Sequence, residues 1–237
     1  METNLSQDQA KRAAGIRAIT TYLRNGMKIG LGSGTTSRWF LQTLGDRVKE
    51  GLEVLGVPTS NSTRDLAIRV GVPVADLNDL GDLDLAIDGA DEIDASGRMI
   101  KGGAGNLLWE KIIAVASVKM VALVDESKVV SKLGKFPLPV EVIPFGWRTT
   151  FRHLEKLFSD FGWTSVPIMV RGGLQTPLIT DSGHYLLDCE LGEISDPDGI
   201  ALKLNQIPGV VEHGLFIGIA KEVVIGRADG SAEIRVF

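Results

Sequence analysis

The chain has 237 residues, of which 44% are apolar and 23% are charged, values typical of a globular protein with one large domain or two domains. Its net charge of −5 argues against a general nucleic-acid binder, which needs a basic surface. A single cysteine, Cys189, excludes an intrachain disulfide and fits a reducing cytoplasm. We expect no membrane partner, because the longest apolar stretch, residues 112–124, is too short to span a bilayer.

Up to about residue 124, short apolar runs alternate with helical patterns. A capping pattern at Ser6 opens a first helix that closes at Asn25, and further helices are predicted through residues 39–44 and over 63–70 and 106–117. Strands are predicted over residues 27–31, 52–57, 83–87 and 119–124. This alternation predicts an α/β fold, with a mostly parallel, Rossmann-like sheet and helices on both faces.

The rhythm changes near residue 135. Pro137 and Pro139 interrupt it, since proline cannot donate to a strand ladder. The patterns that follow predict a strand, a helix, two strands and a helix over residues 140–143, 149–161, 166–170, 185–189 and 197–205, and two or three short strands then end the chain. We therefore expect a main domain of residues 1–134 and 209–237 and a smaller α+β (ferredoxin-like) domain of residues 135–208.

Three loops at predicted strand ends carry unusual residues, and the first is Gly-Ser-Gly-Thr-Thr at residues 32–36. Glycines let a backbone approach a ligand closely, and hydroxyls with helix N-terminal amides hold anions. No lysine follows, as a Walker loop requires, and Thr35 occupies the position of a dinucleotide-fingerprint glycine. Glu50 and Glu53 follow this loop at about the spacing where the acidic residue that binds ribose is found in dinucleotide-binding proteins, so a nucleotide site is a further interpretation. A phosphate site and a plain tight turn both remain open.

The second loop holds four carboxylates in seven residues, namely Asp88, Asp91, Glu92 and Asp94. A solvated turn is one interpretation. Another is that Asp88 and Asp91 face a pocket and bind sugar hydroxyls. A magnesium or calcium site is a third, but the EF-hand spacing and a nearby histidine are absent.

The third loop, Lys-Gly-Gly-Ala-Gly at residues 101–105, leads into a helix that is apolar almost all round and is therefore expected to be buried. Burial raises the pKa of a carboxylate such as Glu110 toward values useful in proton transfer. An ion pair of Glu110 with Lys111 or Lys101 is the equally weighted alternative. Lys128, after the next strand, is either a surface residue or a substrate ligand.

In their order along the chain, these segments resemble the A-type ribose-5-phosphate isomerase family. The matching stretches are residues 30–36, 88–92, 101–103, 110–113, 133–144 and 207–216, so the resemblance covers nearly the whole chain. Ser33 and Thr35 exchange the Thr and Ser of the family pattern and keep both hydroxyls. Ala104 stands where a third glycine is usual, which bears on the loop conformation.

The resemblance implies interconversion of ribose 5-phosphate and ribulose 5-phosphate through a cis-enediolate, with no metal or cofactor. Glu110 is then the base between C1 and C2, Lys101 supports the developing oxyanion, and Asp88 and Asp91 contact sugar oxygens and assist ring opening. The implied substrate site also includes Ser33, Gly34, Thr35, Thr36, Gly89, Ala90, Gly102, Gly103, Ala104 and Lys128. The family further implies the non-oxidative pentose phosphate pathway and a homodimer or dimer of dimers.

Two other functions fit the same architecture. A DeoR-type sugar-phosphate sensor needs a DNA-binding module, and only one helix precedes the first strand. A coenzyme A transferase-like enzyme uses a glutamate nucleophile, but the phosphate-type loop and the Lys101 segment favour an isomerase. The histidines, His153, His184 and His213, lie outside these loops and are expected to be structural or on the surface.

Overall fold

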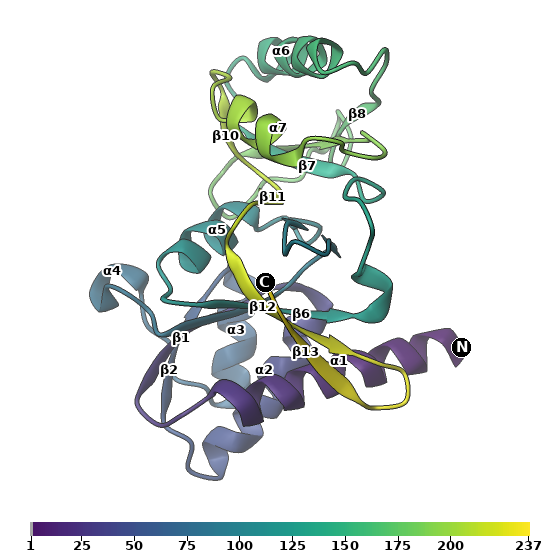
Figure 1. The fold of residues 1–237 in the computed structure, drawn as a ribbon. Helices are drawn as coiled ribbons and strands as arrows, with labels where there is room; N and C mark the ends of the chain where they lie inside the picture. Colours follow the sequence, from purple (N-terminus) through teal and green to yellow (C-terminus); the bar gives the residue numbers. More distant parts are fainter. Residues whose placement is uncertain (1) are drawn as a thin grey trace.

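The computed structural model describes residues 2–237, with side chains from residue 6 onward. Figure 1 shows a large unit built on a twisted sheet and a smaller unit stacked beyond one end of it. The large unit contains α1 (Glu2–Tyr22), β1 (Met27–Leu31), α2 (Gly34–Lys49), β2 (Val54–Pro58), α3 (Asn61–Val70), α4 (Leu77–Leu80), β3 (Leu85–Gly89), β4 (Glu92–Ile93), β5 (Met99–Ile100), α5 (Leu107–Val115), β6 (Met120–Asp125), the short 3₁₀ helix η1 (Glu126–Lys128), β11 (Leu215–Phe216), β12 (Ala220–Gly226) and β13 (Ala232–Val236).

The main sheet has the strand order β13-β12-β6-β3-β1-β2. All neighbours in it are parallel except β12 and β13. Side chains alternate between its faces: Val121 and Leu123 of β6 face a core shared with α1, α2 and α3, and Ala122 faces a core shared with α5. This is the predicted mostly parallel α/β sheet with helices on both faces.

The smaller unit is a four-stranded antiparallel sheet of order β10-β7-β9-β8, covered by two helices. Its elements are β7 (Leu138–Val142), α6 (Trp147–Asp160), β8 (Ile168–Val170), β9 (Tyr185–Cys189), α7 (Pro197–Leu204) and β10 (Val210–His213). Leu154 and Phe158 of α6 pack on Leu187 and Cys189 of β9 in a separate core. The expected α+β domain is therefore present, and β10 extends it past residue 208.

Three predictions about elements were wrong. The first helix begins at Glu2, four residues before the capping pattern at Ser6. Pro139 lies inside β7, between β9 and β10 in the sheet, although proline was expected to interrupt the strand. It is tolerated because the facing carbonyl of Gly214 accepts from the backbone N–H of Lys101 instead (2.9 Å).

The third error concerns α5, which is not buried all round. Its buried residues recur at helical spacing, as Leu107, Glu110, Ile113 and Ala114. Val115 is 69% exposed on the opposite side, where no element of the described chain covers it. The apolar composition of α5 predicts burial on all sides, but only its face toward the sheet is covered.

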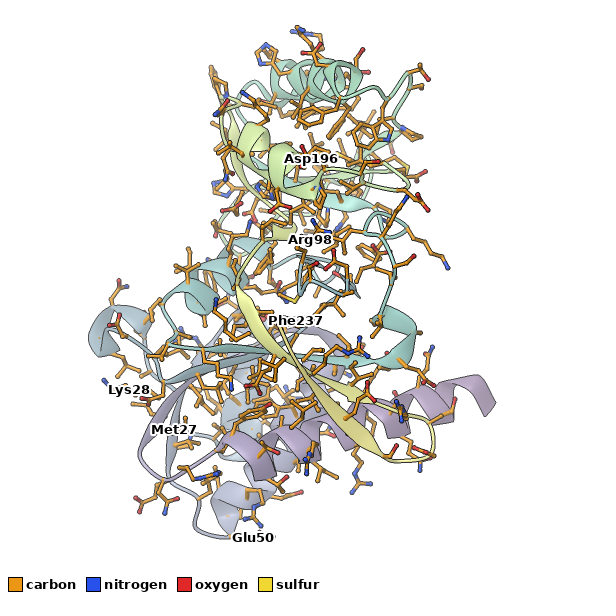
Figure 2. All side chains as sticks on the ribbon, viewed as in Figure 1. Met27, Lys28, Glu50, Arg98, Asp196 and Phe237 are labelled. Atoms are coloured by element: carbon orange, nitrogen blue, oxygen red, sulfur yellow. The ribbon has the colours of Figure 1, made fainter. Side chains whose placement is uncertain are left out.

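A short three-stranded sheet, β11-β5-β4, lies where the two units meet. Arg98, labelled there in Figure 2, donates to Asp94 of the same turn (2.7 Å) and to Asp198 of α7 in the smaller unit (3.1 Å). The loop before β5 thus ties the two units together.

Candidate active site

The predicted loops meet at the carboxyl ends of β1, β3 and β6, which are adjacent in the main sheet. The chain leaves β1 for β2 on one side, while β3 lies on the other, so a ligand crevice is expected at this switch point. A cavity of about 240 Å³ opens there. It is lined by Ser33, Gly34, Thr35, Thr36, Gly89, Ala90, Asp91, Lys101, Gly102, Gly103, Ala104, Glu110 and Lys128.

Asp88 joins the ends of β1, α2 and β3 beneath this cavity. Its Oδ1 accepts from the backbone N–H of Ser33 (3.0 Å), the hydroxyl of Ser37 (3.2 Å) and the backbone N–H of Gly89 (2.7 Å). A Cβ on Gly32 would lie 2.1 Å from that oxygen, so only glycine allows β1 to end so close to Asp88. Asp88 is 3% exposed, and its Oδ2 faces Lys101.

The N-terminus of α2 faces the cavity without a side-chain cap. Ser33 is the N-cap residue, but its hydroxyl lies among the buried hydroxyls of Thr59 (2.7 Å), Ser60 (3.0 Å) and Thr63 (3.1 Å). The first-turn N–H groups of a helix have no partner within the helix. Together with the helix dipole, such N–H groups attract anions.

Lys101 lies at the centre of the polar cluster, with its side chain 3% exposed. Its ammonium donates to the carbonyl oxygen of Gly89 (2.6 Å) and lies 3.0 Å from Asp88 Oδ2 and 3.2 Å from Glu110 Oε2. Burial by itself lowers the pKa of Lys101, but Asp88 and Glu110 outweigh it and hold that pKa above its usual value. The lysine therefore stays charged inside the site.

Glu110 enters the site from the first turn of α5 and is 4% exposed. Burial raises the pKa of Glu110 to about 8; the charge of Lys101 opposes this shift and that of Asp88 adds to it. Both alternatives from the sequence are present together, since Glu110 is buried with a raised pKa and also pairs with Lys101. Lys111 instead pairs with Glu212 (2.7 Å).

The glycine loop brings Asp91 to the cavity wall. Asp91 Oδ2 accepts from the backbone N–H of Gly103 (2.8 Å), and a Cβ on Gly103 would lie 2.5 Å from Asp91 Oδ1. Gly102 and Gly105 have φ values of +101° and +92°, whereas Ala104 has a negative φ. The departure at Ala104 therefore imposes no backbone strain on the loop.

Comparison with known proteins agrees with this geometry. The family model described as ribose 5-phosphate isomerase A (phosphoriboisomerase A) matches residues 55–230. The chain is 48% identical over 231 residues to ribose-5-phosphate isomerase A 2 of Yersinia pseudotuberculosis serotype I (strain IP32953), covering 97% of this chain and 98% of the relative. It is also 48% identical over 226 residues to ribose-5-phosphate isomerase A of Nitrobacter hamburgensis, covering 95% and 97%.

The chain belongs to the ribose 5-phosphate isomerase A family. Solved structures agree: a D-ribose-5-phosphate isomerase in complex with phospho-erythronic acid has a TM-score of 0.90 at 35% identity, over 98% of this chain and 99% of that one. Ribose 5-phosphate isomerase A from Methanocaldococcus jannaschii has a TM-score of 0.87 at 36% identity, over the full length of both chains. The chain is thus an aldose–ketose isomerase of ribose 5-phosphate and ribulose 5-phosphate, and the sensor and transferase alternatives are not favoured.

In this member of the family, the other two carboxylates of the acidic loop, Glu92 and Asp94, make structural hydrogen bonds within the chain. Glu92 accepts from the backbone N–H groups of Gly134 and Phe136, both at 2.7 Å. Asp94 accepts from the backbone and side chain of Arg98. Among the residues described, no three His, Cys, Asp or Glu side chains gather as a metal site would require, and no helix is long and apolar enough to cross a membrane.

The histidines lie outside the cavity lining. His153 is exposed, and His184 pairs through Nδ1 with Glu141 (2.9 Å). His213 is buried between the carbonyl of Ala201 (3.0 Å) and the backbone N–H of Leu215 (3.2 Å). Cys189 is buried, and burial raises the pKa of its thiol.

Sequence reasoning missed the layer of residues behind the cavity. Thr59 and Ser60 from the turn after β2 and Thr63 from the first turn of α3 support Ser33, and Ser37 supports Asp88 from α2. The sequence offers one signal for the first group, a hydroxyl-rich run after the end of β2. It offers none for Arg171, which reaches the glycine loop from the smaller unit.

Proposed function

We propose that Glu110 is the base that moves a proton between C1 and C2 of the sugar phosphate and that Lys101 holds the oxygen that becomes negative. The support is their burial together, 3.2 Å apart, in one cavity. A carboxylate with a pKa raised to about 8 is a stronger base than an exposed one, and an ammonium fixed in advance stabilises an enediolate. One of its three protons goes to Gly89, which leaves two for substrate and carboxylates.

We assign the phosphate group to the other end of the cavity. The open N-terminus of α2, at Gly34, Thr35 and Thr36, supplies backbone N–H groups and hydroxyls for an anion. Lys128 lines the same cavity and adds a positive charge. This placement sets the two ends of an open-chain pentose phosphate against the two ends of the cavity.

Asp88 and Asp91 take the hydroxyl groups between those ends. Asp88 Oδ2 is buried and accepts no hydrogen bond from the residues described, although Lys101 lies within ion-pair distance. Asp91 accepts from Gly103 through Oδ2, and none of the residues described donates to its Oδ1. We assign to this pair the contacts with sugar hydroxyls and the proton transfers that open the furanose ring.

A relative was solved with phospho-erythronic acid, which supports a ligand that carries an anion at each end. A phosphorylated sugar acid carries a phosphate at one end and a planar, negatively charged carboxylate at the other. An enediolate formed from ribose 5-phosphate has the same arrangement of charges. The residues that line this cavity therefore suit a ligand with an anion at each end.

For the whole protein we propose a metal-free and cofactor-free reaction in the non-oxidative pentose phosphate pathway, in the cytoplasm. The substrate of the enzyme is a phosphorylated pentose, and the proposal includes no nucleic-acid or membrane partner. We also propose that the chain forms a homodimer or a dimer of dimers. The main domain comprises about residues 1–134 and 214–237, with β10 assigned to the smaller domain, because β10 pairs with β7.

The proposal is tested by assaying conversion of ribose 5-phosphate to ribulose 5-phosphate with purified protein in excess EDTA. We expect full activity, because Lys101 stands where a metal would otherwise stabilise the oxyanion. Loss of activity that returns on adding a divalent cation would contradict the metal-free reaction. An inactive protein that still binds ribose 5-phosphate would instead support the sensor alternative.

A further inference from the structure

Arg171 connects the smaller domain to the catalytic loop. It follows β8, and its Nη1 donates to the carbonyl oxygens of Gly102 (2.8 Å) and Gly103 (3.2 Å). These residues directly follow Lys101, and Gly103 carries the N–H that holds Asp91. Arg171 itself does not line the catalytic cavity. Any effect on the reaction therefore passes through the loop.

Asp188 of β9 fixes the orientation of the guanidinium. Its two oxygens accept from Arg171 Nε (2.9 Å) and Nη2 (2.5 Å), which is the fork arrangement that only arginine makes. The two side chains are 17% and 18% exposed, so water screens the pair only in part. With Nε and Nη2 held in this way, Nη1 is directed at the glycine loop.

The loop needs such support because its own sequence does little to fix it. Gly102 and Gly105 adopt positive φ, and four of the five residues from Lys101 to Gly105 lack a side chain larger than a methyl group. One internal hydrogen bond, from the N–H of Gly105 to the carbonyl of Gly102 (3.0 Å), closes the turn. Glycine-rich backbone has many accessible conformations, so contacts from outside decide which one is occupied.

We propose that Arg171, held by Asp188, is a positioning residue for the isomerase reaction. It anchors two successive carbonyls of the glycine loop and so fixes Lys101 and the N–H donor to Asp91 in the geometry that the transition state requires. Through this contact the smaller domain takes part in catalysis without touching the substrate. The inference rests on the proposed roles of Lys101 and Asp91.

The test compares steady-state kinetics of Arg171→Lys, Arg171→Ala and Asp188→Asn with the wild type. We expect kcat to fall by about tenfold to a hundredfold in the alanine variant, while KM changes by less than about threefold, because a misplaced oxyanion donor weakens the transition state more than substrate binding. The lysine variant keeps a charge but not the fork, and we expect kcat to stay low in it.

Arg152→Ala is the matched control. Arg152 also lies in the smaller domain, is exposed, and donates to Thr149 of its own helix (3.0 Å). We expect this variant to keep wild-type kcat and KM. Circular dichroism of each variant shows whether the fold is kept, and should Arg171→Ala not fold, Arg171→Lys and Asp188→Asn carry the test.

Added guanidinium ion provides a readout that a purely structural role would not move. We expect millimolar guanidinium to restore part of the kcat of Arg171→Ala and to leave Arg152→Ala unchanged. Folded Arg171 variants with kcat within about twofold of the wild type would overturn the inference. Lys101→Gln, measured alongside, separates the two claims: if it stays active, the proposed role of Lys101 fails first.

Discussion

Three carboxylates, Asp88, Asp91 and Glu110, surround the buried ammonium of Lys101, so one positive charge faces three acidic groups. The electrostatic cost of this arrangement falls on Glu110, whose pKa burial raises to about 8. Asp88 accepts three hydrogen bonds at its Oδ1. At the scale of residues, the site therefore favours Glu110 as the group that binds and releases a proton.

The pH dependence of kcat/KM follows from that shift. Only ionised Glu110 acts as a base, so kcat/KM is expected to rise with pH through an apparent pKa near 8 in the free enzyme, well above the ordinary carboxyl value of 4.5. The measurement is kcat/KM from about pH 5 to about pH 9.5 in buffers of constant ionic strength. Circular dichroism at intervals of about one pH unit checks that the protein stays folded. An acid limb with an apparent pKa near 4.5 would show that Glu110 is not desolvated.

The sequence predicted which side chains gather at the cavity but not their pairing. Residues after β1, β3 and β5 carried recognisable motifs, and they line one cavity. Whether Glu110 was a base or an ion-pair partner stayed open because burial and the approach of Lys101 depend on tertiary packing. The hydroxyl of Ser33 points into a buried cluster rather than being fully available to a ligand, and local sequence carries no sign of that.

At the scale of elements, the glycine loop owes its shape to close approaches between backbone and carboxylates. Gly103→Ala tests this, because the three atoms nearest to the added Cβ all belong to the Asp91 side chain, at 2.5–2.9 Å, and Gly103 has no positive φ. We expect Asp91 to be displaced, with kcat/KM reduced by at least about tenfold and the fold kept. Ala104→Gly is the control and should behave like the wild type. Wild-type kinetics in Gly103→Ala would show that Asp91 is dispensable.

The segment from β10 to β11 makes stability depend on pH. Burial first, and then the charge of Lys111, lower the pKa of His213 to about 3 from 6.5. Below pH 6.5 the unfolded chain binds a proton that the folded chain does not, so this residue reduces the free energy of unfolding as pH falls toward about 3. Protonation would also turn Nδ1, which accepts from the N–H of Leu215, into a donor.

Urea unfolding of the wild type and of His213→Asn at several pH values from 7.5 to about 4.5 measures this contribution. We expect the wild type to lose stability more steeply than the variant below about pH 6.5, by at most about 1.4 kcal/mol per pH unit. Equal slopes for the two proteins would mean that His213 does not titrate differently in the folded and unfolded states.

Elements with a simple apolar pattern were predicted closely, and those fixed by tertiary contacts were not. The predicted strands at residues 27–31 and 185–189 match β1 and β9 residue for residue. The prediction at Pro139 failed because it assumed that every residue inside a strand must donate a backbone hydrogen bond. Here the N–H of Lys101 takes the place of the missing donor. The prediction that α5 is buried on all sides failed because the sequence does not say which elements pack against each face of a helix.

At the scale of the whole molecule, large apolar side chains remain uncovered around α5. Val115 and Val118 are 69% and 80% exposed, and Ile112 is 48% exposed. Exposed apolar patches of this kind mark contact surfaces. We expect light scattering after size exclusion to give twice or four times the chain mass of 25.5 kDa. A mass of one chain at micromolar concentration would contradict the proposed homodimer or dimer of dimers.

The domain boundary and the role of Arg171 were beyond reach of the sequence for the same reason. Both depend on contacts between segments far apart in the chain: β10 with β7, and Arg171 with Gly102. Ordered motifs were enough to identify the family and all of the residues that line the cavity. They give no sign of Arg171, which holds the glycine loop in place.

Proton transfer by Glu110 is tested most directly by running the isomerisation in D₂O, with wild type and Glu110→Gln compared by proton NMR. We expect the wild type to convert ribose 5-phosphate and incorporate solvent deuterium at the carbon that receives the proton. Glu110→Gln keeps the shape but not the base, so both conversion and exchange should fall by at least about a thousandfold, with ribose 5-phosphate still bound. A folded Glu110→Gln protein that converts and exchanges at rates close to those of the wild type would show that another group moves the proton.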